Sequence, residues 1–161
     1  MYAPNTASNK KYYVQAGANP GTAGTLAAPF NTIQRGIDAA APGDSIFVMA
    51  GTYTNTAGSD VVVIRRTGTP TNWIVLTNYQ NDKPKLSFNG YQGFNLVAGA
   101  AYIKIQGFEI EGNNANVTLA QATTQPGSCD NPTGTVNPAF NGNGISVSGR
   151  GAVMYGHITL P

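Results

Sequence analysis

Short alternating segments recur along the chain at nearly regular intervals, and this repeat limits the fold more than any other feature. Ile46, Trp73 and Tyr102 each open a segment of the same kind, and their separations in the numbering are 73 − 46 = 27 and 102 − 73 = 29. His157 opens another, and its separation from Tyr102, 157 − 102 = 55, fits one repeat plus an insertion. A period of about 20–50 residues that holds several short strands is typical of solenoids, whose coils stack because none can bury its apolar side alone.

The repeated segments have the pattern of β-strands. Apolar and polar residues alternate in short runs, and Gly, Asn, Pro or Asp bounds almost every run. Stacked coils would pair such strands in parallel sheets at a spacing of about 4.8 Å, and the Val/Ile-rich runs fit buried parallel strands. The predicted strands cover residues 12–17, 45–53, 60–66, 73–79, 84–88, 93–99, 102–112, 143–149 and 157–160.

One segment departs from this β pattern and has the period of a helix. Ile33 and Ile37 fall on one face, Asn31 or Thr32 can cap the start, and Pro42-Gly43 ends the run. A helix of about ten residues is marginal alone, so it must lie on an apolar surface. The first coil of a solenoid has an open apolar end and unpaired strand edges. We therefore predict a capping α-helix at the N-terminal end of the solenoid.

The charge balance excludes several classes of protein. Charged residues make up 10% of the chain, the net charge is +2, and there is no run of Lys or Arg, so we predict no nucleic-acid partner. No apolar run reaches about 18 residues, so no membrane span is predicted. The N-terminus has no signal-peptide pattern. We expect either that such a segment has been removed or that the chain begins inside a longer gene product.

The chain holds a single cysteine and a single histidine. Cys129 lies in a Gly/Pro/Asn-rich stretch and cannot form an intrachain disulfide. Cys129 could act as a nucleophile only in a pair with His157, and the sequence offers no third catalytic residue nearby. The alternative is that Cys129 is incidental and that His157 lies in a turn.

Three regions follow from these patterns. Residues 1–11 are polar and aperiodic and form a flexible lead-in. Residues 12–44 hold a first strand, a loop and the capping helix. Residues 45–161 form the first coils of the solenoid, interrupted at 113–141 by a long loop that is rich in turn-forming residues.

The stretch "PFNTIQRGIDAAAPGDSIFVMAGTY" (29–53), together with "YYV" before it and "WIVLTNYQNDKPKLSF" (73–88) after it, resembles the N-terminal part of the pectate-lyase-like superfamily. The nearest resemblance is to bacterial secreted proteins around polysaccharide lyase family nine. It covers residues 12–112 and resumes at "NGNGISVSG" and "HITL". The resemblance implies an all-β fold, a right-handed parallel β-helix with its N-terminal helical cap.

The same resemblance implies an activity. Members of this family are secreted, act on acidic polysaccharides, and use calcium-assisted β-elimination with Lys or Arg as the base. In that family the calcium carboxylates and the base lie on middle coils, and this chain stops at Pro161, around the start of its fourth coil. We therefore expect a C-terminally truncated fragment that continues into further coils in its parent protein, and we assign no catalytic residue.

Strand 102–112 carries the most suggestive side chains. If its Ile and Phe residues face inward, Lys104, Glu109 and Glu111 face outward, with a phase shift at Gly107. Glu109 and Glu111 could then bind calcium through their oxygens, or they could form a solvated strand face. Lys104 could serve as a base or contact substrate, or it could be a plain surface lysine.

Other residues could contact a sugar. Arg65 could hold a uronate carboxylate in a bidentate manner, with Arg66 on the opposite face, or it could be solvated. Trp73 and Tyr102 occupy equivalent positions and should stack on each other between coils. The rings of Tyr79 and Tyr91 are further candidates for stacking on sugars. Asparagines in the turns predict ladders of side-chain hydrogen bonds along the solenoid, at Asn78, Asn89 and Asn113. A glycosylation sequon lies at 116–118.

Two functions from different classes remain open at this stage. The first is the N-terminal part of a secreted polysaccharide lyase that cleaves uronate-containing chains. The second is a non-catalytic carbohydrate-binding or surface-adhesive solenoid, in which 113–141 and the polar faces bind. A third interpretation is a structural fragment whose uncovered C-terminal end makes the isolated chain associate.

Overall fold

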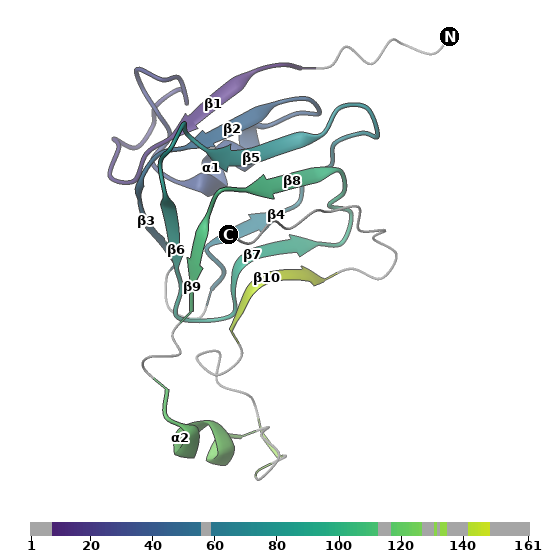
Figure 1. The fold of residues 1–161 in the computed structure, drawn as a ribbon. Helices are drawn as coiled ribbons and strands as arrows, with labels where there is room; N and C mark the ends of the chain where they lie inside the picture. The colour runs from purple at the N-terminus through teal and green to yellow at the C-terminus, as the bar shows by residue number, and fades with distance from the viewer. Residues whose placement is uncertain are drawn as a thin grey trace.

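A computed structural model describes residues 8–55, 59–112, 117–126, 131, 133–134 and 142–148. This part of the chain forms three parallel sheets, which we name A, B and C (Figure 1). Sheet A contains, in order, β1 (Lys11–Val14), β2 (Ser45–Val48), β5 (Ile74–Asn78) and β8 (Ile103–Gln106). Sheet B contains β3 (Gly51–Thr54), β6 (Pro84–Ser87) and β9 (Glu109–Glu111), and sheet C contains β10 (Asn143–Ser148), β7 (Gln92–Val97) and β4 (Val62–Ile64).

The chain passes through sheets A, B and C in turn, once per coil, and every neighbouring pair of strands is parallel. This winding confirms the predicted parallel solenoid. One predicted spacing is wrong: Ile46 lies opposite Leu76 rather than near Trp73, so the first repeat is 76 − 46 = 30 and not 27. In the observed register, buried residues of neighbouring coils lie opposite each other. Trp73 lies just before β5 and does not enter the core. Ile74 lies opposite Ile103, so the second predicted repeat, 103 − 74 = 29, is confirmed.

Two segments that the alternation predicts as single strands are each divided by a sharp turn. The segment 45–53 breaks after β2, and 102–112 breaks at Gly107 between β8 and β9. Gly107 has φ +76°, and a Cβ at this position would collide with the side-chain amide of Asn78. Glycine is therefore required here, both for the backbone conformation and for the close approach of the neighbouring coil. At each break the chain leaves sheet A and enters sheet B.

The inward side chains of the three sheets form one apolar core. Successive coils stack like on like, as Ile46, Leu76 and Ile105 do in sheet A and Val62 and Phe94 do in sheet C. The fully buried apolar side chains are Phe94, Ile33, Ile37, Ile46, Ile64, Ile74, Leu76, Leu86, Val14, Val48 and Val62. Helix and sheet residues thus share a single core.

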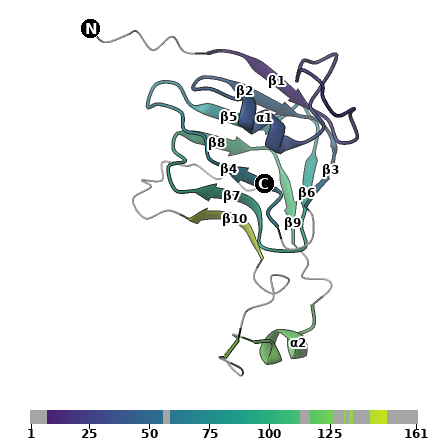
Figure 2. The ribbon, with the colours of Figure 1, turned by 180° about the vertical axis from the view of Figure 1, so that it is seen from behind.

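Helix α1 (Ile33–Ala39) lies across the first coil, as the capping prediction requires (Figure 2). Thr32 caps it by accepting a hydrogen bond from Arg35 N at 3.3 Å. The helix contacts β1, β2 and β4. It can approach them closely because Gly36 faces the core, where a Cβ would lie 2.8 Å from Ile46 Cγ2. The observed helix has seven residues, shorter than the predicted ten.

The exposed strand edges at this end are also covered. Gln34 of α1 donates from Nε2 to Val63 O (3.0 Å) and accepts at Oε1 from Val63 N (2.7 Å), so its amide substitutes for a further strand beside β4. On sheet A, the loop before the helix pairs with the outer edge of β1, where Gln15 N donates to Phe30 O and Phe30 N donates to Tyr13 O, each at 2.8 Å. At the N-terminal end of the solenoid, the edges of sheets A and C are therefore blocked to further strands.

Two segments that the sequence assigns to loops carry defined structure. Residues 8–11, placed in the lead-in, are held by hydrogen bonds from Ser8 N to Pro42 O (3.1 Å) and from Lys10 N to Asp44 Oδ1 (2.8 Å). Within 113–141, helix α2 (Leu119–Thr124) follows Thr118, whose side chain and Gln121 form a capping box. No described helix is long and apolar enough to cross a bilayer.

Candidate functional site

An open groove lies where the chain turns from sheet A into sheet B. The turn after β5 spans residues 79–83, whereas the turns after β2 and β8 are only the pairs 49–50 and 107–108. Residues of both turns line the groove. We call its side at 78–83 the wall and its side at 106–109 the floor. The groove has a volume of about 860 Å³ and is lined by Asn78, Gln80, Asn81, Asp82, Lys83, Gln106, Gly107, Phe108 and Glu109.

The wall of this groove is fixed by hydrogen bonds within the turn and to the preceding coil. Asn78 Nδ2 donates to Gln80 O and to Asp82 O, both at 3.0 Å. Asp82 Oδ2 accepts from Ala50 N at 3.0 Å. Gln80 adopts φ +50°, a left-handed conformation that costs a non-glycine residue about 1–3 kcal/mol and is found preferentially at functional sites. The turn is therefore held in one strained shape before any ligand arrives.

The floor combines an amide, a bare glycine and an aromatic ring. Gln106 Nε2 donates to Thr77 Oγ1 of the preceding coil at 3.2 Å. Gly107 is exposed, and Phe108 is half-buried with its ring edge-on to Phe94 at a centroid distance of 5.2 Å. Phe108 thus joins the lining of the groove to the apolar core.

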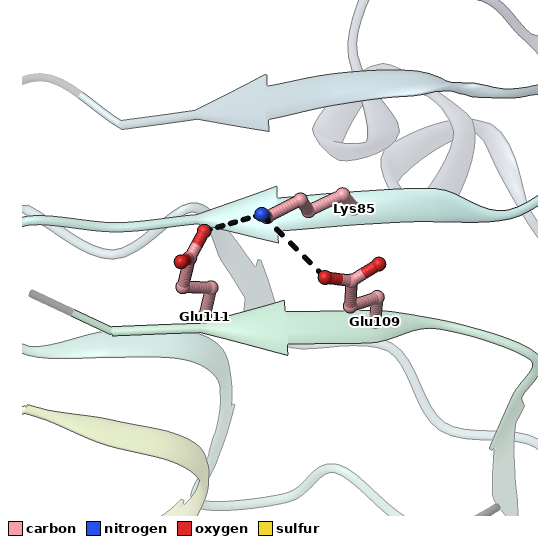
Figure 3. Close-up of polar contacts among 3 residues, drawn as sticks. All are labelled: Lys85, Glu109 and Glu111. Carbon is pink, nitrogen blue, oxygen red and sulfur yellow. Dashed lines mark ion pairs between the residues drawn. The ribbon is translucent and has the colours of Figure 1, made fainter.

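Next to the groove, sheet B carries a cluster of three charges on its outer face. Lys85 of β6 lies between two carboxylates of β9, with its Nζ 2.5 Å from Glu111 Oε2 and 3.5 Å from Glu109 Oε1 (Figure 3). The hydrogen bond to Glu111, with the charges of both glutamates, raises the pKa of Lys85. The two glutamate side chains are 59% and 55% exposed, so this cluster is an exposed ion pair of small energetic weight.

This arrangement bears on the calcium site that the sequence suggests at Glu109 and Glu111. Their predicted outward orientation is confirmed, since both are exposed while Leu86 opposite Ile110 is buried. The position between their carboxylates, however, holds the ammonium of Lys85. Calcium takes about six to eight oxygen ligands, and the described residues contain no group of three or more His, Cys, Asp or Glu side chains that could hold a metal. The residues present here do not fit a calcium ion.

The other candidate residues lie on different sheets. Lys104 is exposed on β8 of sheet A, and Arg65 is exposed just beyond β4 of sheet C. Neither forms an ion pair within the described part of the chain. Arg66, next to Arg65, donates to Asp38 O. The structure thus places the carboxylates, the lysine and the arginine on three sheets and does not bring them to one face.

The aromatic candidates form contacts between coils. Trp73 and Tyr102 contact each other between coils as predicted, with ring centroids 5.8 Å apart, but they pack edge to face and are not stacked. Tyr79 packs edge-on to Tyr13 at 5.7 Å and to Phe47 at 6.4 Å. These rings lie on the outer side of sheet A, because the alternate positions Ile46 and Val48 are buried.

The asparagine turns differ from one another. The prediction of a side-chain ladder is wrong at Asn78, whose amide bonds within its own turn. At Asn89 the bond between coils involves the main chain, because Asn89 N donates to Asn55 Oδ1 at 3.2 Å. Thr118 of the sequon serves as the cap of α2. Cys129, His157 and Asn113 lie outside the described residues.

Sequence reasoning missed the groove and the central lysine of the cluster. Lys85 lies opposite Glu109 in the register of β6 and β9, and Ser87 lies opposite Glu111. That register could have been counted from the repeat once the sharp turns were placed. The signal for the groove was the unequal turn length, visible as "YQNDK" (79–83) against "GF" (107–108).

Comparison with known proteins identifies the architecture. A family model described as "Pel9A-like, right handed beta helix region" matches residues 12–149, which confirms the predicted right-handed parallel β-helix. No curated protein gives a significant match.

Two solved structures are similar to the chain. One is the pectate lyase Pel9A, with a TM-score of 0.52 and 22% identity over 64% of this chain and 28% of that one. The other is a rhamnogalacturonan lyase, with a TM-score of 0.58 and 19% identity over 69% of this chain and 30% of that one. The chain therefore spans less than a third of either lyase, and at these identities the likeness concerns the fold alone.

Proposed function

We propose a function from one premise, that the chain belongs to the Pel9A-like right-handed β-helix family. In this proposal, the chain supplies the N-terminal coils of a polysaccharide lyase that cleaves uronate-containing chains. The match over residues 12–149 is the observation that carries this proposal. Two similar structures, named as a pectate lyase and a rhamnogalacturonan lyase, support a polysaccharide as substrate.

The proposed reaction is a β-elimination. A base removes the proton from C5 of a uronate, the electron pair forms the C4–C5 double bond, and the C4–O bond to the leaving sugar breaks. The leaving oxygen takes up a proton, and a 4,5-unsaturated uronate is produced. Because the candidate charges lie on three sheets, we propose that the base belongs to coils that these residues do not include. Glu109 and Glu111 do not fit calcium, so we assign these two residues no metal-binding role in the reaction.

We also propose that the protein acts outside a bacterial cell. A surface poor in charge and rich in Asn, Thr and Ser supports this location, with 10% of residues charged. Fractionation of the source culture, with an antibody to residues 12–112, would test it.

The lyase proposal is tested by the product of the reaction. The chain, and the gene product extended past Pro161 if the reading frame continues, are incubated with polygalacturonate and with rhamnogalacturonan. We expect the extended protein to release products with the ultraviolet absorbance of an unsaturated uronate, while residues 1–161 alone release none. New reducing ends without that absorbance would indicate hydrolysis and would overturn the proposal.

A second candidate function is a non-catalytic carbohydrate-binding or adhesive solenoid. The groove beside residues 79–83 favours it, because a rigid turn with polar side chains is already in place there. Binding of polysaccharide by the chain, with no unsaturated product from any extended form, is the result expected for this alternative.

A further inference from the structure

We propose that the groove beside residues 79–83 is a binding site for an uncharged stretch of a glycan chain, which it holds without cleaving. The choice of a glycan rests on the proposed function, whereas the position and the preference for an uncharged chain rest on the geometry below. A groove of about 860 Å³ falls within the range of small-ligand sites, roughly 300–1,000 Å³.

The wall is built in advance of binding. Its backbone is fixed by Asn78 at two carbonyls, by Asp82 to the preceding coil, and by Tyr79 N, which donates to Val48 O at 2.7 Å. A site that is already ordered loses little conformational entropy when a ligand binds. The strained conformation of Gln80 at the rim is further support, since such strain persists only where the surroundings impose it.

The rim offers polar groups that are largely free to bind a ligand, as far as the described residues show. The exposed side chains of Asn81 and Lys83 make no hydrogen bond or ion pair within the part of the chain that the structure describes. Gln80 Nε2 donates only to the hydroxyl of Tyr79, at 3.2 Å. Sugar hydroxyls both donate and accept, so amide and ammonium groups at a rim suit them. Phe108 packs against the core and also contributes to the lining, so the groove has an apolar component beside its polar groups.

The charges around the groove decide between an acidic and an uncharged ligand. The lining and the adjacent cluster contain two ammonium groups, on Lys83 and Lys85, against three carboxylates, on Asp82, Glu109 and Glu111. A net negative groove repels a polyuronate. An uncharged sugar, or a uronate whose carboxyl is esterified, meets no such repulsion.

Esterification offers a matched pair of probes, because it removes the charge of the sugar and keeps the backbone. Binding of fully methyl-esterified homogalacturonan and of polygalacturonate to the chain would be measured by calorimetry and by NMR, at low and high salt. The test variant is Asn81→Ala/Lys83→Ala. The control is Asn19→Ala/Lys11→Ala, the same chemical changes at exposed sites on and near β1.

We expect the esterified chain to bind more tightly than polygalacturonate and with little salt dependence. NMR shifts should be confined to 79–83 and 106–109. The test variant should lose affinity roughly tenfold, as expected for about two hydrogen bonds, while the control keeps it. The proposal is overturned if the esterified chain does not bind, if both double variants weaken binding equally, or if polygalacturonate binds better in a salt-sensitive manner. The absence of unsaturated products would count against the lyase proposal and leave this one standing.

Discussion

Tyr53 shows how one hydroxyl joins three parts of the first coil. It accepts a hydrogen bond from Ala16 N at 3.1 Å and donates to Met49 O at 2.9 Å, and the residue is only 5% exposed. Burial is the main reason why the pKa of Tyr53 rises from 10.0 to about 12. The protonated phenol is therefore part of the fold.

The raised pKa of Tyr53 predicts a loss of stability in alkali. The unfolded chain releases this proton near pH 10, whereas the folded chain keeps it until about pH 12. The stabilising contribution is thus complete below pH 10 and is lost as the pH rises towards 12. Urea unfolding between pH 8 and 11.5 should show a steeper fall for the wild type than for Tyr53→Phe. Equal slopes would mean that the phenol of Tyr53 is not linked to folding.

At this scale the sequence predicts side-chain direction better than partners. The outward positions of Lys104, Glu109 and Glu111 follow from alternation, and the Trp73–Tyr102 contact follows from the repeat. The ammonium between the two glutamates does not follow from alternation, because it depends on the register of another coil. Lys85 lies one coil before Glu109, and counting that separation from the repeat requires the turn lengths, about which alternation carries no information.

Among the elements, α1 stabilises sheet C through Gln34. Replacing Gln34 with Met leaves Val63 N and Val63 O without their amide partner at the edge of β4. We expect a loss of about 1–3 kcal/mol in the free energy of unfolding. Faster hydrogen exchange at Val63 N should accompany it.

The matched control for Gln34→Met is Gln15→Met, since the side chain of Gln15 is exposed on the loop after β1. It should change the free energy of unfolding by less than about 0.5 kcal/mol. Equal losses in the two variants would show that the amide of Gln34 adds nothing beyond ordinary surface effects.

The cluster between β6 and β9 makes a prediction about calcium. With Lys85 in place, millimolar calcium should bind neither Glu109 nor Glu111, so the melting temperature should respond to calcium or a chelator alike in the wild type and in Glu109→Gln/Glu111→Gln. Thermal melts with each addition would measure this. A calcium-dependent rise that the double variant abolishes would restore the metal site and require Lys85 to move aside.

Element boundaries were the least predictable part of the fold. Alternation continues through Met49 and through Gly107, yet the chain bends at both places. A bend between two sheets keeps the inward positions apolar on either side, so a hydrophobic pattern does not reveal it. Glycine at φ +76° is the local signal at the second bend.

At the scale of the whole molecule, the two ends of the solenoid differ. At the first coil, α1 covers the core and the edge of β4, and the segment before α1 pairs with β1. Sheets A and B end at β8 and β9, whose outer edges pair with no strand among the described residues. Parallel edges of this kind attract other strands.

We therefore expect residues 1–161 to self-associate in solution through this second end. The sedimentation coefficient should rise with concentration, and Gln106→Lys, which adds a charge on the outward side of β8, should reduce the effect. Circular dichroism would verify that the variant keeps its β structure. A single concentration-independent monomer with a cooperative thermal melt would contradict the expectation.

The overall architecture is what the sequence predicts best, because a repeat and a cap are global patterns that tolerate local errors. Placing the second repeat at Trp73 instead of Leu76 did not change the fold that the repeat implied. The groove, in contrast, depends on the difference between two turns, and a search for similarity between repeats removes such differences.

The sealed first coil also gives the chain a direction of assembly. During synthesis the N-terminal residues leave the ribosome first, so α1 and β1 can cover the first coil before later strands exist. Each new coil can then pair with the strands of the coil before it, while the opposite edges of sheets A and C are already covered. A nascent chain of this kind can therefore add its coils in the order in which they are translated.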